Sequence, residues 1–528
     1  MTEIARHLSV SPQAVSNWRR RHPSFPRATK VGGGESFAVD EVAKWLDDRK
    51  IPTKDLQPSE LPGTTYGERF RGALDMGEPT GGLREADVLD ELDRLRGTHD
   101  VRSFAELVFV LLHVALARDD AWPDLRAAGG QKLLEVLPLL TPQFEPLGDF
   151  RRSAYAISRD PRGTDRLTSL IRLVQRVQER GGTGVTEFLL EHLTSTMGRG
   201  DGTVHTPPEL VRLLVEVLDP DEGAAVLDPC CGVGELLAGV ARHRGSPDGG
   251  PYSRSFTGAA LSPRTAKLAS MNLRMHGAQA QVSAKSTEII RSSAPAPGRR
   301  YDVVLTNPPF DMRFPPESEG LRGDYGSLPP NKTNFAWLQH AVSFLRDGGR
   351  AAVVMPGSTL FSSGVEQRIR GKMIDDGVVE AIVSLPSHLF ASTAIPVTVW
   401  FLGKRPRRRA GEVLLVDAGG LGRMTSRTQR SLSAEEWARI GDAVRRWRVE
   451  DGYEDVAGFC ASISHGNVLE QDYVLVPARY VGAAAAARVE PSRSVRELRD
   501  DLRRLEARAA EVDAVVEERL DRVRTWIR

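Results

Sequence analysis

Tyr301-Asp-Val-Val-Leu-Thr-Asn-Pro-Pro-Phe310 is the stretch of this sequence that decides the predicted fold. Its apolar run at 303–305 lies between Asp302 and a double proline. This suits a buried parallel strand that ends abruptly, because proline cannot donate to a β-ladder. Ligands of open α/β sheets bind at the carboxyl ends of strands. The residues after this strand are therefore the first candidates for a functional site.

A second pattern lies upstream, where residues 224–237 read Ala-Ala-Val-Leu-Asp-Pro-Cys-Cys-Gly-Val-Gly-Glu-Leu-Leu. The pattern predicts a strand, a tight glycine turn and a helix. Gly232 and Gly234 would let a ligand approach the backbone, and Asp228 at the strand end can accept a hydrogen bond from a ligand amine. A lone Gly-x-Gly also occurs in structural turns. Its position upstream of the strand at 301–310 is what favours a ligand-binding turn here.

Strands and helices alternate between these two patterns and beyond them. A helix begins within His205-Thr-Pro-Pro-Glu-Leu210 and ends near residue 218. Further strands are predicted at 256–261, 280–284, 350–355, 378–385 and 396–402, with helices at 263–276 and 334–345. This alternation predicts a doubly wound α/β sheet. Residues 413–416 are expected to add an edge hairpin.

The Asn-Pro-Pro-aromatic tetrad suggests a chemistry. An exocyclic amine of adenine or cytosine is a poor nucleophile, because its lone pair is delocalised into the ring. The side-chain carbonyl of Asn307 and the backbone carbonyl of Pro308 could accept its two hydrogens, and Phe310 could stack on the base. A base inside a duplex cannot reach such a pocket, so base flipping is implied. The alternative is a plain turn that ends a strand.

Composition narrows the class of protein. The 528 residues predict two to four domains, and 71 Lys and Arg against 70 Asp and Glu give a formal net charge of +1. Any affinity for nucleic acid must therefore come from local patches. Three cysteines, two of them adjacent, indicate neither a disulfide framework nor a metal site. With an apolar run at 107–117 that is too short for a membrane span and no signal peptide, we expect a soluble cytoplasmic protein.

The first 50 residues have the pattern of a winged helix-turn-helix. One helix ends near Leu8, and Ser11 and Pro12 supply the N-cap and first residue of a second helix. Residues 25–37 predict a hairpin wing, and 40–46 a closing helix. The segment resembles the DNA-binding domains of excisionase-like and MerR-type proteins, and a protein-docking module is the alternative. The candidate DNA contacts on the second helix are Gln13, Ser16, Asn17, Arg19 and Arg20.

The remaining segments complete the predicted domain organisation. Apolar periodicity predicts a helical domain between a Pro- and Gly-rich linker and the sheet. At the C-terminus apolar residues recur three and four apart from Val495 to Val516, which predicts a coiled-coil seam. That helix could pack on a partner or on the chain's own surface. The predicted units are a winged helix-turn-helix at 1–50, a linker at 51–82, a helical domain at 83–200, a Rossmann-like domain at 201–420, an α/β extension at 421–490 and a coiled-coil helix at 491–528.

Five ordered motifs give residues 83–481 a resemblance to the modification (methyltransferase) subunit of Type I restriction-modification systems, the N6-adenine DNA methylase family. The motifs are His205-Thr-Pro207, Val226-Leu-Asp-Pro-Cys-Cys-Gly-Val-Gly234, Thr306-Asn-Pro-Pro-Phe310, Gly348-Gly-Arg-Ala-Ala-Val-Val-Met-Pro356, and Leu385-Pro-Ser-His-Leu-Phe390 followed by Ile395-Pro396. The resemblance implies S-adenosylmethionine as methyl donor, a sheet with an antiparallel last strand, and double-stranded DNA as substrate. It also implies a specificity subunit, and a restriction subunit as a possible further partner.

The resemblance also assigns residues to sites. Asn307, Pro308, Pro309 and Phe310 would hold the flipped adenine, and Phe390 could add an aromatic face. The residues assigned to the methyl donor, chiefly its methionine part, are His205, Thr206, Pro207, Asp228, Cys230, Gly232, Gly234 and Glu235.

Two departures from the family pattern bear on the donor. Ala260 stands where the family has the acidic residue that binds the ribose hydroxyls, and Lys285-Ser286 replaces Gly-Asp near the donor's adenine. Each missing charge-assisted hydrogen bond is worth about 1.5–3 kcal/mol. The expectation is an adenine-N6 DNA methyltransferase. The alternatives are a cytosine-N4 methylase, or a weakly active or inactive DNA-binding subunit that keeps the fold; protein glutamine methylation is opposed by the DNA-binding module.

Overall fold

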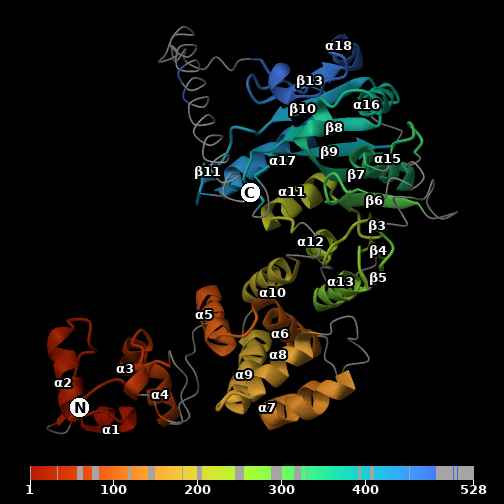
Figure 1. Cartoon of the computed structure of the whole chain (residues 1–528). Coiled ribbons are helices and arrows are strands. Elements are labelled where there is room, and N and C mark those ends of the chain that lie inside the picture. Colours follow the sequence, from red (N-terminus) through yellow and green to blue (C-terminus); the bar gives the residue numbers. More distant parts are fainter. Residues whose placement is uncertain are drawn as a thin grey trace, which may run out of the picture.

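The computed structural model describes most of the chain, and its elements are labelled in Figure 1. The described residues are 2–31, 34–55, 57, 64–73, 83–116, 121–140, 149–180, 182–198, 205–243, 255–286, 300–313, 323–329, 331–390, 394–404, 409–427, 429–450, 452–482, 504 and 508.

A nine-stranded, mostly parallel sheet dominates the structure (Figure 1). Its spatial order is β5-β4-β3-β6-β7-β9-β8-β10-β13. The strands are β3 (Ala225–Asp228), β4 (Ser255–Ala259), β5 (Ala280–Ser283), β6 (Tyr301–Thr306), β7 (Leu345–Pro356), β8 (Val379–Ser384), β9 (Val397–Gly403), β10 (Glu412–Asp417) and β13 (Cys460–Ser464).

Strand direction decides where the site forms. β3 to β8 and β10 run the same way, whereas β9 is antiparallel to both β7 and β8, as the resemblance implied. The predicted edge hairpin at 413–416 is wrong. β10 lies inside the sheet, parallel to β8, and its antiparallel partner β13 follows only after a long segment that contains a helix. The extension at 421–490 therefore continues this sheet, since β13 is its edge strand.

Helices cover both faces of the sheet, because its central strands are apolar on both sides. One face packs on α11 (Pro208–Leu218), α12 (Glu235–Arg242), α13 (Pro263–Met275) and α17 (Ala434–Val449). The other face packs on α15 (Asn334–Phe344) and α16 (Val365–Asp375), and α18 (His465–Glu470) adds to that layer. This is the predicted doubly wound arrangement.

A helical body precedes the sheet (Figure 1). It contains α5 (Glu85–Arg96), α6 (Val101–Leu116), α7 (Ala121–Leu140), α8 (Asp149–Ser158), α9 (Gly163–Arg180) and α10 (Gly182–Gly198). The apolar run of the sequence is α6, buried at the centre of this body. α13 joins the two bodies, since Leu268 and Met271 pack among these helices and Arg264 pairs with the buried carboxylate of Glu106.

The N-terminal unit has the predicted order of elements. It contains α1 (Thr2–Leu8), α2 (Pro12–Arg21), an antiparallel ribbon of β1 (Thr29–Val31) and β2 (Gly34–Ser36), and α3 (Val39–Asp47). The linker prediction fails for part of its length, because α4 (Tyr66–Ala73) packs against this unit through Tyr66 and Phe70. The glycines and prolines on either side of α4 indicated a linker, although α4 itself contains apolar residues.

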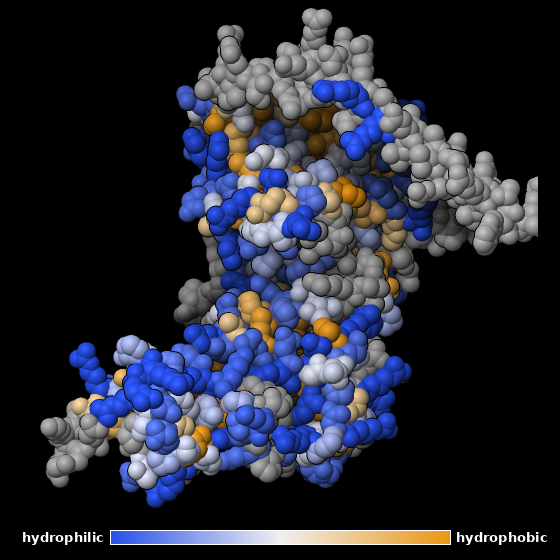
Figure 2. Space-filling model, turned by 60° about the vertical axis from the view of Figure 1, so that its left-hand side comes forward, coloured by the Kyte–Doolittle hydropathy of each residue, from blue (hydrophilic) through white to orange (hydrophobic). Residues whose placement is uncertain are grey.

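The surface of the described residues is mainly hydrophilic on the face shown in Figure 2, with hydrophobic residues in smaller groups. None of the described helices is both long and apolar enough to cross a membrane. The predicted coiled-coil helix at 491–528 lies outside the described residues, apart from Arg504 and Arg508.

Candidate functional site

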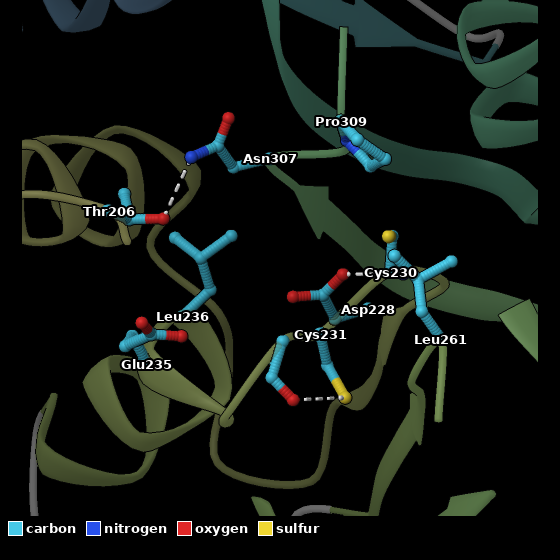
Figure 3. Close-up of a pocket in the computed structure, with 10 residues that line it drawn as sticks. Thr206, Asp228, Cys230, Cys231, Glu235, Leu236, Leu261, Asn307 and Pro309 are labelled. Atoms are coloured by element: carbon cyan, nitrogen blue, oxygen red, sulfur yellow. Dashed lines mark hydrogen bonds between the residues drawn. The ribbon is translucent and has the colours of Figure 1, made fainter. Parts of the chain in front are cut away.

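An open cleft lies at the carboxyl edge of the sheet, where β3 and β6 end side by side (Figure 3). Residues from four segments line it: the approach to α11, the turn after β3, the turn after β4 and the tetrad after β6. The lining residues are Thr206, Asp228, Cys230, Cys231, Gly232, Glu235, Leu236, Leu261, Asn307 and Pro309. The two patterns that were about 80 residues apart in the sequence therefore meet in one cleft.

Asn307 is fixed with one polar atom unsatisfied. Its side chain is only 6 % exposed, and its Nδ2 donates to Oγ1 of Thr206 at 3.0 Å. Within the described structure its Oδ1 is buried and has no partner. A buried acceptor without a partner is costly, so its presence in a cleft is the mark of a ligand site. Figure 3 shows the amide between Thr206 and Pro309.

The hydrogen bond from Asn307 gives Thr206 a role that sequence analysis missed. The resemblance assigned Thr206 to the methyl donor. In the structure α11 begins at Pro208 without a side-chain cap, and the Thr206 hydroxyl accepts from the Asn307 amide. Spacing of 101 residues gives no local signal for such a pair.

The turn after β3 presents backbone and one carboxylate to the cleft. Gly232 and Gly234 adopt φ of 52° and 87°, and a Cβ at Gly234 would lie 3.3 Å from Ala269 Cα, which explains the glycine there. Asp228 is buried, and its Oδ1 accepts from the Cys230 amide at 2.9 Å. Burial raises the pKa of Asp228 to about 7, against the opposing effect of that hydrogen bond.

The two adjacent cysteines lie in the same turn but are poor nucleophiles. Burial raises the pKa of the Cys230 thiol to about 12 and raises the pKa of Cys231 as well. The thiolate is the reactive form of cysteine, so neither residue fits covalent attack on a base. Both line the cleft, although only Cys230 was assigned to the donor site.

His205 lies beside the cleft and contacts one of the residues that line it. Its Nδ1 is 3.0 Å from Oε1 of Glu235, the first residue of α12. A carboxylate at a helix N-terminus is favoured by the helix dipole. His205 lines a neighbouring cavity that shares Thr206 and Glu235 with the cleft.

Ala260, at the position where the resemblance predicts a ribose-binding acid, is completely buried. Its amide donates to the Ser283 carbonyl, and its carbonyl accepts from the Ser286 amide. The Ser286 hydroxyl donates to the Pro229 carbonyl at 2.8 Å. Neither residue lines the cleft, and Leu261 does so instead. Leu261, like Leu236 and Cys231, was missed by the sequence analysis, although its place just after a parallel strand was a usable signal.

The remaining assigned residues lie around the cleft or away from it. Pro308 is buried, Pro309 and Phe310 are half-buried, and Pro207 is the N-cap residue of α11. Phe390 is 2 % exposed, lies in the hydrophobic core and is not among the residues that line the cleft. On α2 the candidate DNA contacts are exposed or half-buried, and Arg20 donates to Asn17 at 3.0 Å.

Comparison with known proteins gives the class. The family model described as N-6 DNA Methylase matches residues 183–488, more than half of the chain. The chain therefore belongs to the N-6 DNA methylase family, and by that membership it is an adenine-specific DNA methyltransferase.

Individual relatives are methylase subunits of restriction enzymes. The chain is 34 % identical over 304 residues to the Type I restriction enzyme HindI methylase subunit of Haemophilus influenzae, covering 57 % of this chain and 68 % of that subunit. It is 29 % identical to the MjaIX methylase subunit of Methanocaldococcus jannaschii, covering 56 % of this chain and 55 % of that one. The fold matches the type I methyltransferase subunit of Streptococcus thermophilus with a TM-score of 0.57 at 20 % identity, over 76 % of this chain and 99 % of that one.

Proposed function

We infer that this protein transfers a methyl group from S-adenosylmethionine to N6 of a flipped adenine in double-stranded DNA, as the modification subunit of a restriction-modification or similar defence system. The unpartnered, buried Oδ1 of Asn307 in the cleft is the observation on which this rests. The family supplies the reaction class, and this atom supplies the place where the acceptor amine would bind.

Asn307 would act by polarising the amine. Its Oδ1 and the Pro308 carbonyl would accept hydrogen bonds from the two N–H groups of the adenine amine. These bonds would shift electron density from the ring back onto the nitrogen. Thr206 keeps the amide in the orientation that presents Oδ1 rather than Nδ2. In the transfer a bond from N6 to the donor's methyl carbon would form as the methyl–sulfonium bond breaks and S-adenosylhomocysteine leaves, and the nitrogen would lose a proton to solvent. No covalent intermediate with the protein is required, in agreement with the raised thiol pKa values.

The cleft fits the methionine end of the donor. S-adenosylmethionine, when bound, supplies a methyl group on a sulfonium. The cleft offers two carboxylates, Asp228 and Glu235, and the glycine turn, which suit an ammonium group and a close backbone approach. At the ribose end the described residues present Leu261 in place of a carboxylate, so donor binding relies more on the methionine end.

The burial of Asn307 supports base flipping. Asn307 lines the cleft and is only 6 % exposed, so a base that remains stacked in a duplex could not reach it. We place initial contact with DNA on the exposed face of α2, with Gln13, Ser16, Arg19 and Arg20. A separate specificity subunit would select the site, and residues 491–528 would be its docking helix.

One observation favours a second function, a DNA-binding subunit with weak or no turnover. Ala260 is buried and Ser286 is engaged with Pro229, so two contacts expected for the donor are absent. Calorimetry with S-adenosylmethionine separates the two functions, since the inactive subunit would not bind the donor.

The test of the proposed function is methyl transfer to DNA by the full chain together with the specificity protein encoded beside it. Nucleoside analysis of the product distinguishes N6-methyladenine from N4-methylcytosine. Asn307→Ala is expected to reduce transfer by a factor on the order of 10² to 10³, the cost of one lost polarising group, with donor affinity changed only a few fold. Asn467→Ala, on exposed α18, is the matched control. Transfer near the wild-type rate by Asn307→Ala would reject the assignment.

A further inference from the structure

A charged ribbon on the same side of the sheet as the cleft has no role in the function above. Strands β11 (Arg423–Met424) and β12 (Arg430–Ser431) form an antiparallel ribbon that projects from the sheet (Figure 1). The segment 418–434 contains three arginines and no acidic residue, while Asp417, Glu435 and Glu436 flank it. The exposed stretch 423–427 therefore carries two arginines and no carboxylate of its own.

Topology places this ribbon on the same side of the sheet as the cleft. β10 runs parallel to β8 and so, through the sheet, in the same direction as β6. The chain that leaves the carboxyl end of β10 is therefore on the edge where Asn307 follows β6. The Arg430 amide donates to the His388 carbonyl at 2.8 Å, which also fastens the ribbon to the segment after β8.

The ribbon is braced at its base and exposed at its tip. The Gly422 amide donates to Glu436 Oε1 at 2.9 Å, and the Arg430 guanidinium, which is half-buried, donates to the Leu421 carbonyl at 3.0 Å. Arg423 and Arg427 are exposed, and Met424 between them is 44 % exposed. Neither of these two arginines takes part in a salt bridge within the described part of the chain. A fixed ribbon with exposed guanidinium groups is suited to bind phosphates.

We propose that the ribbon at 423–431 binds the DNA duplex beside the flipped adenine, with Arg423 and Arg427 on its phosphates. This inference deepens the proposed function and rests on DNA being the substrate of the cleft. A two-stranded ribbon also has the width of the major groove, which allows it to lie along the duplex.

The sheet gives the expected distance from the target base. β10 lies four strand positions from β6, and neighbouring strands are about 4.8 Å apart, which places the ribbon's base about 19 Å from the tetrad. For a duplex whose axis follows the sheet edge, at about 3.4 Å per base pair, this is about five to six base pairs from the adenine. Neutral methylphosphonate substitutions should therefore interfere with binding at that separation.

The experiment compares two double variants of the full chain. Arg423→Ala with Arg427→Ala removes the ribbon's charge. Arg445→Ala with Arg446→Ala is the control with the same change in net charge, because these α17 arginines are paired with Asp442 and Glu450. Affinity for a fluorescent duplex is measured by anisotropy over a series of salt concentrations. The ribbon variant is expected to bind more weakly, with a log–log salt slope shallower by about 1–2, since each phosphate contact contributes about 0.9.

The outcomes separate this inference from the proposed function. If the wild-type protein methylates DNA and the two double variants show equal salt slopes of DNA affinity, the ribbon inference alone is overturned. A wild type that never methylates DNA, with a shallower slope for the ribbon variant, overturns the enzymatic function and supports the ribbon as a DNA contact. Loss of the specificity protein on co-purification, with an unchanged slope, would make the ribbon a protein-docking surface and reject its contact with DNA. Unchanged donor binding by calorimetry shows that the ribbon variant is folded.

Discussion

Replacing Thr206 with valine tests whether the active amide must be held in one orientation. Valine keeps the shape of threonine but cannot accept from Asn307 Nδ2, which now lies 3.0 Å from the hydroxyl. Without that bond the amide can rotate by half a turn and present its NH₂ group to the adenine amine. Two donors then face each other, and the acceptor that polarises the amine is lost.

The structure sets the size of the effect. Both residues are buried, at 3 % and 6 % exposure, so water does not replace the missing hydroxyl freely. A neutral hydrogen bond of this kind contributes about 0.5–1.5 kcal/mol, and about 1.4 kcal/mol corresponds to a factor of ten. Thr206→Val should therefore lower kcat by about 2- to 13-fold. Thr206→Ser, which keeps the hydroxyl, should restore most of the rate.

The assay must distinguish an effect on the orientation of the Asn307 amide from an effect on binding of the methyl donor. Single-turnover methyl transfer reports the chemical step, and calorimetry reports the donor Kd for wild type and both variants. We expect the rate to fall in Thr206→Val while the donor Kd stays within a few fold of the wild-type value, because the hydroxyl that is removed is bonded to Asn307. A higher donor Kd with an unchanged rate would refute the positioning role. It would favour a contact between Thr206 and the methyl donor, as the sequence analysis predicts.

Three further predictions concern the donor, DNA and the C-terminus. Burial raises the pKa of Asp228 to about 7, so the carboxyl of the free protein is protonated below that pH. Donor affinity, measured by calorimetry, should therefore fall about tenfold per pH unit below 7 and level off above it. The variant Asp228→Asn should lose this pH dependence. The same shift makes this group's contribution to folding stability greatest below the unfolded pKa of about 3.9 and lost as pH rises towards 7. Arg19→Ala with Arg20→Ala should make the salt slope of DNA binding shallower by at most about two, and an unchanged slope would favour protein docking by residues 1–50. Deleting residues 491–528 should leave donor binding intact but abolish co-purification of the specificity protein, and equal recovery of the partner would reject that interface.

Local patterns were enough to predict most of the sheet. Strand 301–306 and the glycine turn after 225–228 depend on short-range rules: apolar runs prefer burial, proline ends a ladder, and glycine permits positive φ. These rules act within a few residues, so the sequence alone shows them. The same rules failed at α4, where glycine and proline on either side indicated a linker, although Tyr66 and Phe70 form part of the core of the N-terminal unit.

Only the tertiary structure decided which side chains meet in the cleft. The composition of 413–416 predicts a strand equally well at the edge or inside a sheet, and the parallel pairing of β10 with β8 is a long-range choice. The Thr206–Asn307 hydrogen bond and the burial of Ala260 likewise depend on chain segments far apart in sequence. The sequence by itself determined the strand that ends just before Asn307, because that depends on local chemistry. The orientation of its amide was decided by folding, because its partner is 101 residues away.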